Sequence, residues 1–473
     1  MKHAKLFIRG AWTDGESAVE LADKFHGDTV AQVHQASREQ VTAALQGVAQ
    51  GQLEHRLTPY QRYRVLSEAS RLLRRRRDEF VDTIVTDAGF TIGDAEKEVD
   101  RAEQTLLLSG EEAKRIAGEM VPLDSAPTAP GRYAFTIRRP LGVVCAITPF
   151  NSPLNTVAHK VAPALAAGNS VILKPASFTP LTACLLVELL LEAGLPESLI
   201  AVVHGSGSTV GQQLLESPVP AFYAFTGSTE VGERLHRTVG LRRTQLELGS
   251  LSSTIVCDDA AVERVAPLCV GAAFRKAGQV CTSVQRLYVQ SRVLPEFLDS
   301  LTTDLRSRAA GDPRAKGTFV GPVISGADAD RIESWIEAAT RRGAEVVCGG
   351  TREGQVIAPT VLTNVDAEMD VFCREIFGPV VTVRPFTDLQ QAIAEANDTP
   401  YGLAAGVFTA DLGRALDAAD GLRMGSVHIN ETSSSRVDLM PYGGVKDSGM
   451  GLEGPRYAIE EMTEQRLITI GRP

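Results

Sequence analysis

From residue 141 onward, short apolar runs alternate with longer stretches in which apolar residues recur every three or four positions. The runs are typical of buried strands and the longer stretches of helices. The predicted strands span 141–147, 170–174, 199–203 and 221–225, and the predicted helices span 155–167 and 180–194. Strands that alternate with helices predict βαβ units and a parallel sheet.

A second alternating set follows the first. Its predicted strands span 253–257, 285–290, 344–348 and 380–386, and its predicted helices span 260–275, 326–342 and 388–397. Two α/β sheets in series predict two lobes with a cleft between them, and ligands commonly bind at such an interface.

Two strand-like segments lie outside both sets, at 132–140 and 466–471. We expect them either to pair with each other or to add to the sheet of another subunit. No internal repeat or low-complexity segment accompanies them.

Length and charge narrow the function class. A chain of 473 residues is expected to form two or three domains. Its 44% hydrophobic and 22% charged residues are typical of a soluble globular protein. The net charge of −10 argues against nucleic acid as the main partner. Because no apolar run has the length of a signal-peptide core or a membrane span, we expect a cytoplasmic protein with no membrane partner.

The cysteines predict free thiols. There are seven, an odd number, and no C-x-x-C pair occurs among them. This pattern favours a reducing compartment and predicts no metal site. Six are interpreted as structural, at positions 145, 184, 257, 269, 348 and 373. The seventh, Cys281, follows a helical run that breaks at Gly278 (AFRKAGQVCTSVQRLYV), so it is either a small buried side chain or a nucleophile held at a turn.

Three segments indicate a nucleotide site. The segment 224–235 (AFTGSTEVGERL) predicts a strand, a glycine-rich turn and a helix, a combination that can bring a helix N-terminus to a pyrophosphate. A second glycine-rich segment, 204–211 (HGSGSTVG), could serve similarly or be a plain left-handed turn. In 171–177 (VILKPAS), Lys174 leaves a predicted strand toward the crevice. Ser177 occupies the position at which a carboxylate could bind the cofactor ribose. Because a serine does not repel a 2′-phosphate, NADP becomes acceptable as well as NAD.

Two polar residues are candidates for acyl chemistry. Glu247, in 244–250 (TQLELGS), lies between two leucines at a strand end, where desolvation would raise its pKa and suit it as a general base. The alternative is an exposed strand-end glutamate. Asn151, in 147–160 (ITPFNSPLNTVAHK), could donate its amide to an oxyanion or simply cap the next helix.

Seven motifs occur in one order along nearly the whole chain: TPFN, KPAS, FTGSTEVG, ELGS, GQVC, EIFGP and PYGGVKDSGMG. In this the chain resembles the aldehyde dehydrogenase superfamily, of the non-acylating, NAD(P)-dependent kind. The segments 454–464 (GPRYAIEEMTE) and 436–451 (RVDLMPYGGVKDSGMG) are most similar to its lactaldehyde and phosphonoacetaldehyde dehydrogenase branch.

The resemblance implies the α/β aldehyde dehydrogenase fold. A Rossmann-like NAD(P)-binding domain would comprise 1–122 and 141–248, and an α/β catalytic domain would comprise 249–436. Residues 123–140 and 457–473 would form a β oligomerisation arm, because family members are dimers or tetramers that exchange such an arm.

The resemblance also assigns the catalytic residues. Cys281 would attack an aldehyde, Asn151 and the Cys281 backbone N–H would stabilise the oxyanion, and Glu247 would activate water to release a carboxylic acid. A free thiol is only a few per cent ionised at neutral pH, so Cys281 needs activation. Relatives that acylate coenzyme A usually lack the glutamate. Such an enzyme, or a non-catalytic structural relative, is the alternative. Ser250 departs from the family pattern, since many relatives carry a second glycine there.

For the cofactor, NAD or NADP, the resemblance implies contacts from both lobes. The expected residues are Thr148, Pro149, Phe150, Lys174, Ala176, Ser177, Gly207, Gly211, Phe225, Thr226, Gly227, Ser228, Leu248, Gly249, Glu375 and Phe377.

The expected substrate is a short aldehyde that carries an anion or a hydroxyl. The most specific form of this prediction is an aldehyde that carries a phosphonate. The expected contacts are Arg101, Ser152, Asn155, His159, Val280, Thr282 and Arg436. Asn151, Asn155 and His159 follow i, i+4 spacing and share a helix face, which would make the wall of the tunnel polar. The two arginines suit carboxylate, phosphate or phosphonate oxygens. A solvent-facing helix and surface arginines are the alternatives. Relatives specific for phosphorylated three-carbon aldehydes carry an arginine in place of Val280.

Overall fold

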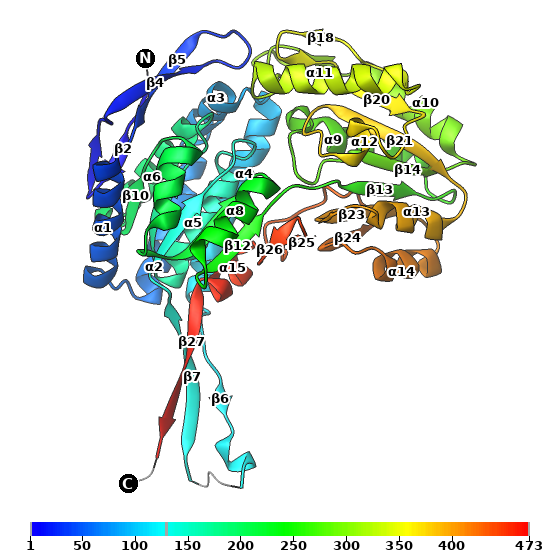
Figure 1. Ribbon diagram of the computed structural model, residues 1–473. Helices are drawn as coiled ribbons and strands as arrows, with labels where there is room; N and C mark the ends of the chain where they lie inside the picture. Colours follow the sequence, from blue (N-terminus) through cyan, green and yellow to red (C-terminus); the bar gives the residue numbers. More distant parts are fainter. Residues whose placement is uncertain (1, 128–130, 472–473) are drawn as a thin grey trace.

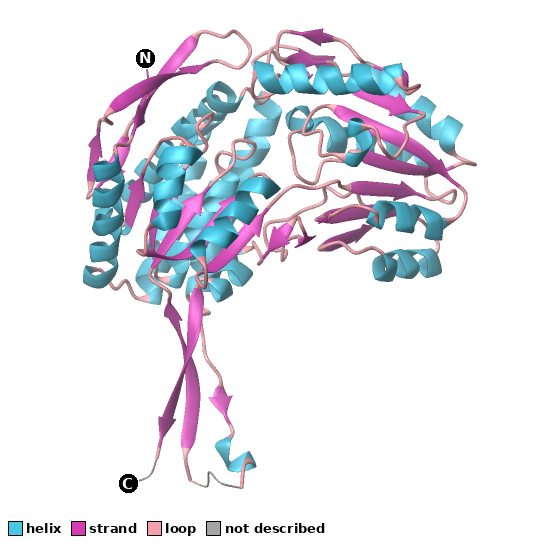
Figure 2. Cartoon of the chain, in the orientation of Figure 1, coloured by secondary structure: helices cyan, strands magenta, loops and turns pink. Residues whose placement is uncertain are grey.

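The computed structural model describes residues 2–127 and 131–471. Two α/β lobes lie side by side, and a narrow β arm projects away from the first of them (Figure 1). Figure 2 shows helices packed around the sheets of both lobes, whereas the arm is almost entirely strand. Within the described ranges, no helix is long and apolar enough to cross a membrane.

The first lobe is built on an eight-stranded sheet in the order β26-β12-β11-β8-β9-β10-β2-β3. Its five central strands run parallel, and β26, β2 and β3 join the edges antiparallel. The strands span β2 Leu6–Ile8, β3 Ala11–Thr13, β8 Val143–Ile147, β9 Ser170–Lys174, β10 Ile200–Val202, β11 Pro220–Thr226, β12 Arg243–Glu247 and β26 Gly449–Met450.

Helices cover both faces of this sheet, which explains why its strands are apolar without interruption. Val144 and Ala146 of β8 face one hydrophobic core, and Val143 and Cys145 face the other, as the two-residue period of a strand requires. The helices of this lobe are α1 Arg38–Glu54, α2 Pro59–Arg75, α3 Arg77–Ala88, α4 Ile92–Ala113, α5 Asn155–Ala167, α6 Pro180–Glu192, α7 Gln212–Glu216, α8 Thr229–Val239 and α15 Pro455–Glu461.

The second lobe holds a seven-stranded sheet in the order β17-β20-β21-β14-β13-β23-β24, parallel except for β17. The strands span β13 Ser253–Val256, β14 Arg286–Gln290, β17 Glu345–Cys348, β20 Thr360–Thr363, β21 Val380–Phe386, β23 Ala404–Phe408 and β24 Ser426–Ile429. The helices are α9 Val262–Phe274, α10 Leu294–Arg306, α11 Gly326–Arg341, α12 Asp370–Cys373, α13 Leu389–Asn397 and α14 Leu412–Gly421.

The two stray segments pair with each other. The arm is a three-stranded sheet in the order β27-β7-β6, formed by β6 Met120–Val121, β7 Tyr133–Pro140 and β27 Thr463–Ile470. The antiparallel register runs from Thr463 opposite Pro140 to Ile470 opposite Tyr133. This confirms the first of the two expected pairings. Residues 128–130 and 472–473 of the predicted arm lie outside the described residues.

Smaller sheets complete the fold. A three-stranded sheet at the N-terminal side contains β1 Lys2–Ala4, β4 Ser17–Ala22 and β5 Thr29–Gln35. Three two-stranded pairs join β15 Ala309–Ala310 to β16 Thr318–Val320, β18 Arg352–Glu353 to β19 Val356–Ile357, and β22 Tyr401–Gly402 to β25 Val445–Lys446.

The predicted strands and helices of both sets are present, and most ends agree within one or two residues. The sequence pattern gave no indication of β20, β23 and β24. Strand β26 returns from the C-terminal part of the chain to the first sheet, where Leu246 lies opposite Met450. The predicted boundary between residues 248 and 249 falls between β12 and β13, the last long strand of one sheet and the first sequential strand of the other.

Candidate active site

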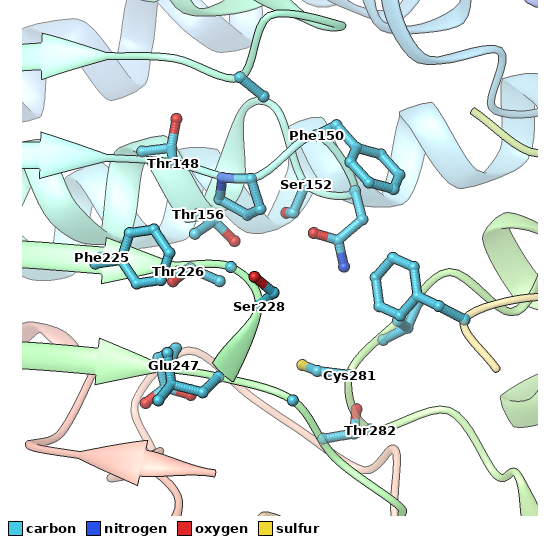
Figure 3. A pocket seen from close by; sticks show the side chains of 18 of the residues that line it. Thr148, Phe150, Ser152, Thr156, Phe225, Thr226, Ser228, Glu247, Cys281 and Thr282 are labelled. Carbon is cyan, nitrogen blue, oxygen red and sulfur yellow. The ribbon is translucent and has the colours of Figure 1, made fainter. Parts of the chain in front are cut away.

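A cavity of about 500 Å³ lies where the two lobes meet. On one side, β8, β11 and β12 end beside Thr148, Thr226 and Glu247, and on the other side the loop with Cys281 and Thr282 faces them (Figure 3). The carboxyl ends of parallel strands are the usual place for a ligand in such a sheet.

Nearly all the predicted site residues line this one cavity; the exceptions are Ser177, Gly211 and His159. Ser177 is exposed, while His159 is buried. A Cβ on Gly211 would lie 4.0 Å from Cε of Lys174, so this glycine lies behind the lysine stem. The predicted residues that line the cavity are Asn151, Glu247, Cys281, Thr148, Pro149, Phe150, Lys174, Ala176, Gly207, Phe225, Thr226, Gly227, Ser228, Leu248, Gly249, Glu375, Phe377, Arg101, Ser152, Asn155, Val280, Thr282 and Arg436.

Cys281 is presented by an unusual turn. Helix α9 ends at Phe274, and Lys276, Ala277 and Gly278 then take φ values of 52°, 54° and 69°. Two consecutive non-glycine residues in the left-handed region are sterically costly and occur mostly at functional sites. A Cβ on Gly278 would lie 2.0 Å from the Gly378 carbonyl oxygen, so only glycine fits there. The break at Gly278 in the sequence therefore corresponds to a turn that the fold holds under strain.

The Cys281 thiol has a specific partner. Its Sγ lies 2.9 Å from Oη of Tyr442, which belongs to the PYGG motif. Burial raises the pKa of the thiol to about 11, and the hydrogen bond with Tyr442 acts in the opposite direction. The remaining cysteines of the chain are free, and four of them are buried in the cores, at 145, 184, 257 and 269.

Asn151 lies beside the turn that presents Cys281. Its amide Nδ2 donates to the Gln279 carbonyl oxygen at 2.9 Å, and its own carbonyl oxygen accepts a hydrogen bond from Nζ of Lys276 at 2.9 Å. Asn151, whose side chain could stabilise an oxyanion, is thus attached to the segment that carries Cys281 once through its side-chain amide and once through its backbone carbonyl oxygen.

Glu98 of α4 completes this attachment. It forms a buried ion pair with Lys276. Its Oε1 also accepts hydrogen bonds from Ser152 Oγ at 3.1 Å and from the backbone N–H groups of Leu154 and Asn155 at 2.9 and 3.2 Å. Because these amides precede or begin α5, Glu98 caps that helix and fixes the loop of Asn151 at the same time.

Glu247 ends β12 as a desolvated carboxyl. It is 3% exposed, and neither of its carboxyl oxygens has a hydrogen-bond partner among the described residues. Burial, reinforced by the nearby Glu453, raises its pKa well above the usual value. An unpaired carboxyl with a raised pKa is what a general base for water requires.

The roof loop, residues 433–444, is fixed in part by the buried carboxylate of Glu453. Glu453 accepts from Nζ of Lys160 at 3.0 Å and from Nη2 of Arg436 at 2.9 Å, and the two cations outweigh burial to lower its pKa. The Arg436 guanidinium also lies 3.7 Å from the centre of the Tyr442 ring. Arg436, predicted as a substrate contact, is therefore engaged by Glu453 and Tyr442.

Asp438 organises the other predicted substrate contacts. Its carboxylate accepts from Arg101 at 2.7 and 3.2 Å, from Nδ2 of Asn155 at 3.1 Å, and contacts Nε2 of His159 at 2.8 Å. Burial would raise the Asp438 pKa, but His159 and Arg101 outweigh it and keep the pKa low. The i, i+4 pair Asn155 and His159 does share a face, and that face contacts Asp438 instead of solvent.

Arg275 differs from the other two arginines in the cavity wall. Its Nη2 donates to Oγ of Ser434 at 2.7 Å, and no carboxylate of the described chain lies within ion-pair distance of it. Burial, with a contribution from the neighbouring Arg101, lowers its pKa. Arg275 is thus a half-buried cation in the cavity wall whose charge is not neutralised by an ion pair.

The far part of the cavity suits a phosphate-bearing group. Lys174 is 6% exposed, burial lowers its pKa to about 8, and its Nζ has no acceptor among the residues described. Ser228 precedes α8 without a side-chain cap, so the first N–H groups of that helix are available to an anion. Glu375 is half-buried near them, accepts from the Ser250 N–H at 3.1 Å, and has a pKa raised by desolvation to about 8.

Several polar side chains of this region were not predicted from the sequence, and they include Glu453, Asp438, Arg275, Lys276, Tyr442 and Glu98. Arg275 and Lys276 precede the nucleophile in the quoted segment, and a charged pair at a helix end was the available signal. Tyr442 lies in a motif that was noted without a role, and Glu98 gave no signal at all. Within 2–127 and 131–471, no group of three or more His, Cys, Asp or Glu side chains is arranged to hold a metal ion.

The chain is similar to known proteins over nearly its whole length. The model of the aldehyde dehydrogenase family matches residues 12–468. The chain is 44% identical over 470 residues to a 3-sulfolactaldehyde dehydrogenase of Priestia aryabhattai, an alignment that covers 99% of this chain and 98% of the relative. It is 35% identical to a lactaldehyde dehydrogenase of Methanococcus maripaludis, over 98% of this chain and 99% of that protein. The crystal structure of the NADP-dependent glyceraldehyde-3-phosphate dehydrogenase of Bacillus halodurans, complexed with NADP, superposes with a TM-score of 0.97 at 33% identity and covers all of both chains.

Proposed function

The chain belongs to the aldehyde dehydrogenase family, and we propose that it oxidises a short aldehyde carrying an anion or a hydroxyl to its carboxylic acid, with NAD or NADP as hydride acceptor. As a member of the family it is an oxidoreductase that acts on aldehydes. The observation that carries the finer proposal is the convergence of Cys281, Asn151 and Glu247 on one cavity.

Cys281 is proposed to form the carbon–sulfur bond to the substrate. Its thiolate adds to the aldehyde carbon and gives a thiohemiacetal. The Asn151 amide keeps one N–H on the Gln279 carbonyl oxygen and donates its second N–H to the developing oxyanion, together with the Cys281 N–H. Donors preorganised in a partly dry site stabilise such a charge strongly. The bound nicotinamide would accept the hydride that converts the thiohemiacetal into a thioester.

Glu247 is proposed to release the product. As a carboxylate it takes a proton from water, the resulting hydroxide attacks the thioester carbonyl, and the Cys281 thiolate departs as the acid forms. Neither of its oxygens has a hydrogen-bond partner among the described residues, which supports this role because a free carboxylate oxygen can accept the proton of a water molecule.

The residues of the far cavity fit a nicotinamide dinucleotide. The unpaired Lys174 suits ribose or 2′-phosphate oxygens, and the uncapped start of α8 with Ser228 suits the pyrophosphate. A Cβ on Gly227 would come within 2.5 Å of the Phe225 ring, so the backbone there stays bare and approachable. Because Ser177 has no carboxylate to repel a 2′-phosphate, we expect the enzyme to accept NADP as well as NAD. We propose Glu375 and Phe377 for the nicotinamide end.

The substrate anion is proposed to meet Arg275. Arg101 and Arg436 already face carboxylates, so Arg275 is the arginine of the cavity wall that offers its full charge. Ser152, Asn155, Val280 and Thr282 would complete a mostly polar wall, with His159 holding it through Asp438. The relative that acts on 3-sulfolactaldehyde, a three-carbon aldehyde with a sulfonate, supports this substrate class.

We also propose the domain division 1–122 with 141–248, and 249–436, and a homo-oligomer, a dimer or a tetramer, that forms through the arm of 123–140 and 457–473. Strand β27 is an edge strand, and its Leu467 and Ile470 are 57% and 53% exposed. An exposed edge with apolar side chains normally pairs with another chain.

The test of the proposed function is a panel of aldehydes assayed with NAD and NADP in parallel. We expect 3-sulfolactaldehyde, phosphonoacetaldehyde, succinic semialdehyde, glyceraldehyde 3-phosphate and lactaldehyde to give higher kcat/KM than propanal and benzaldehyde. The product should be the free acid without added coenzyme A. Preference for propanal or benzaldehyde would contradict the anion-binding wall, and a requirement for coenzyme A would contradict the role of Glu247.

Replacement of Arg275 by glutamine should raise KM for the preferred anionic aldehyde about 10- to 100-fold, because a charge-assisted hydrogen bond contributes about 1.5–3 kcal/mol. KM for propanal should change little, since propanal has no anion to bind. Arg436→Gln serves as the comparison, because its charge is matched by Glu453 and we expect it to affect both aldehydes alike. Equal changes for the two aldehydes in Arg275→Gln would remove Arg275 from substrate recognition.

A further inference from the structure

We propose that Tyr442 is a further catalytic residue, whose phenol hydroxyl donates a hydrogen bond to the Cys281 thiolate and so increases the fraction of reactive sulfur. The inference rests on the proposed function in one respect, the role of Cys281 as nucleophile. It assigns a task to the PYGG motif that the reaction steps above do not use.

The contact is direct and isolated. Tyr442 Oη lies 2.9 Å from Sγ, and no other side chain in the part of the chain that the structure describes is within hydrogen-bond distance of this sulfur. Thiolates are usually stabilised by an adjacent cation or a helix N-terminus. Here a phenol occupies the position next to the sulfur, and Tyr442 is only 6% exposed, so solvent competes little for the bond.

The phenol is kept protonated, as a donor must be. Burial and the neighbouring Cys281 and Glu247 raise the Tyr442 pKa well above its ordinary value. At neutral pH the hydroxyl therefore retains its proton and can donate it to a thiolate.

Arg436 positions and polarises this phenol. Its guanidinium lies over the ring face, 3.7 Å from the centre, in a cation–π contact. Glu453 holds the guanidinium at 2.9 Å, and Lys160 in turn holds Glu453 at 3.0 Å. Arg436 thus acts on the sulfur through Tyr442 and is a positioning residue. The chain Lys160, Glu453, Arg436, Tyr442 and Cys281 connects α5 to the nucleophile.

The other charged groups that face the sulfur oppose one another. Glu247 of β12 and Glu375, which follows α12, disfavour a thiolate, whereas Arg436 favours it. Arg275, on the turn before Cys281, is also close enough to interact with the thiolate. Because these groups surround the sulfur without touching it, the hydrogen bond from Tyr442 is the contact that a single substitution can remove.

The test is the rate at which iodoacetamide alkylates Cys281 at neutral pH, followed on the Cys281 peptide by mass spectrometry. No aldehyde or cofactor is needed. Loss of a hydrogen bond to a charged group corresponds to about one to two units of thiol pKa. A raised thiol pKa lowers the fraction of thiolate in Tyr442→Phe. The remaining thiolate is more nucleophilic, but with a Brønsted coefficient of about 0.4–0.5 this gain offsets only part of the loss. Tyr442→Phe should therefore react about 3- to 12-fold more slowly than the native enzyme.

Two further proteins make the result specific. Tyr288→Phe is the matched control, because Tyr288 is a buried tyrosine of β14 whose hydroxyl has no partner among the described atoms, and it should react like the native enzyme. 3-Fluorotyrosine placed at position 442 keeps the shape and is a stronger donor, so it should react faster than native. An unchanged rate in Tyr442→Phe would overturn the proposal. So would a slow Tyr442→Phe combined with a fluorotyrosine protein that matches the native rate, since that result assigns Tyr442 to packing alone.

The failure of this inference is distinguishable from failure of the proposed function. If Cys281 is not the nucleophile, the Cys281→Ala enzyme will still oxidise the aldehyde, whatever the alkylation rates of the Tyr442 variants. If Cys281 is the nucleophile, alkylation abolishes oxidation in parallel, and only the order of the rates decides the role of Tyr442.

Discussion

Glu247→Gln should give one rapid release of about one equivalent of reduced cofactor per active site and then almost stop. The thioester forms without Glu247, but its hydrolysis loses the base that takes a proton from water. General base catalysis contributes about 10²- to 10⁴-fold, so steady turnover should fall by that range while the burst remains. Rapid-mixing measurement of reduced-cofactor absorbance separates the two phases.

The matched control for Glu247 is Glu461→Gln. Burial raises the pKa of Glu461 to about 7, yet this carboxyl lies outside the cavity wall and bonds the Leu452 N–H. Its replacement should leave the burst unchanged and have only a small effect on steady turnover, because Glu461 makes the smallest of the contributions that act on the Glu247 pKa. Undiminished steady turnover in Glu247→Gln would exclude Glu247 as the base. In the native enzyme, where only the carboxylate form is active, hydrolysis-limited turnover should rise with pH through the raised pKa of Glu247.

Asn151→Ala should show the opposite kinetic pattern, with a slow first phase. The amide is proposed to stabilise the oxyanion of the thiohemiacetal, and removal of one such donor typically costs about 10²- to 10³-fold in rate. The burst should therefore disappear, because thioester formation becomes slower than hydrolysis. Single-turnover kinetics with enzyme in excess measures this step directly.

A control is needed because Asn151 also bonds Gln279. Cofactor affinity, measured by fluorescence titration, should stay close to native in Asn151→Ala, since most residues proposed for the dinucleotide lie in or beside β9, α8 and the loop after α12, and Thr148–Phe150 keep their own side chains. If the burst keeps its native rate, the oxyanion is stabilised elsewhere. A loss of cofactor affinity as large as the loss of rate would instead point to a displaced loop.

The sequence predicted most strands of both sheets because most of them are buried on two faces and form apolar runs of their own, whereas β20, β23 and β24 were missed. The catalytic candidates were found in the same way, as residues at the ends of those runs within ordered motifs. Contacts between distant segments left no local pattern. Glu98 and Lys276 are 178 positions apart and His159 and Asp438 are 279 apart, so neither pair could be read from spacing.

The arginines illustrate the same limit. Arg101 and Arg436 were noticed because arginine suits an anion, but the carboxylates that face them, Asp438 and Glu453, are contributed by other segments of the fold. Arg275 is set apart by the absence of such a partner within the described chain. The availability of a charge depends on what the fold places beside it, which residue type alone does not reveal.

The attachment of Asn151 to the turn of the nucleophile has a consequence for assembly. Glu98 and Asn151 belong to the first lobe, and Lys276 and Gln279 belong to the second. Neither lobe alone contains the complete pocket that we propose for the oxyanion, because each supplies only one half of the attachment. On the proposed mechanism, the protein therefore becomes active only when the lobes dock. A small separation of the two lobes would abolish activity while every helix and strand remained intact. Activity should therefore be lost when the lobes separate, before either lobe unfolds.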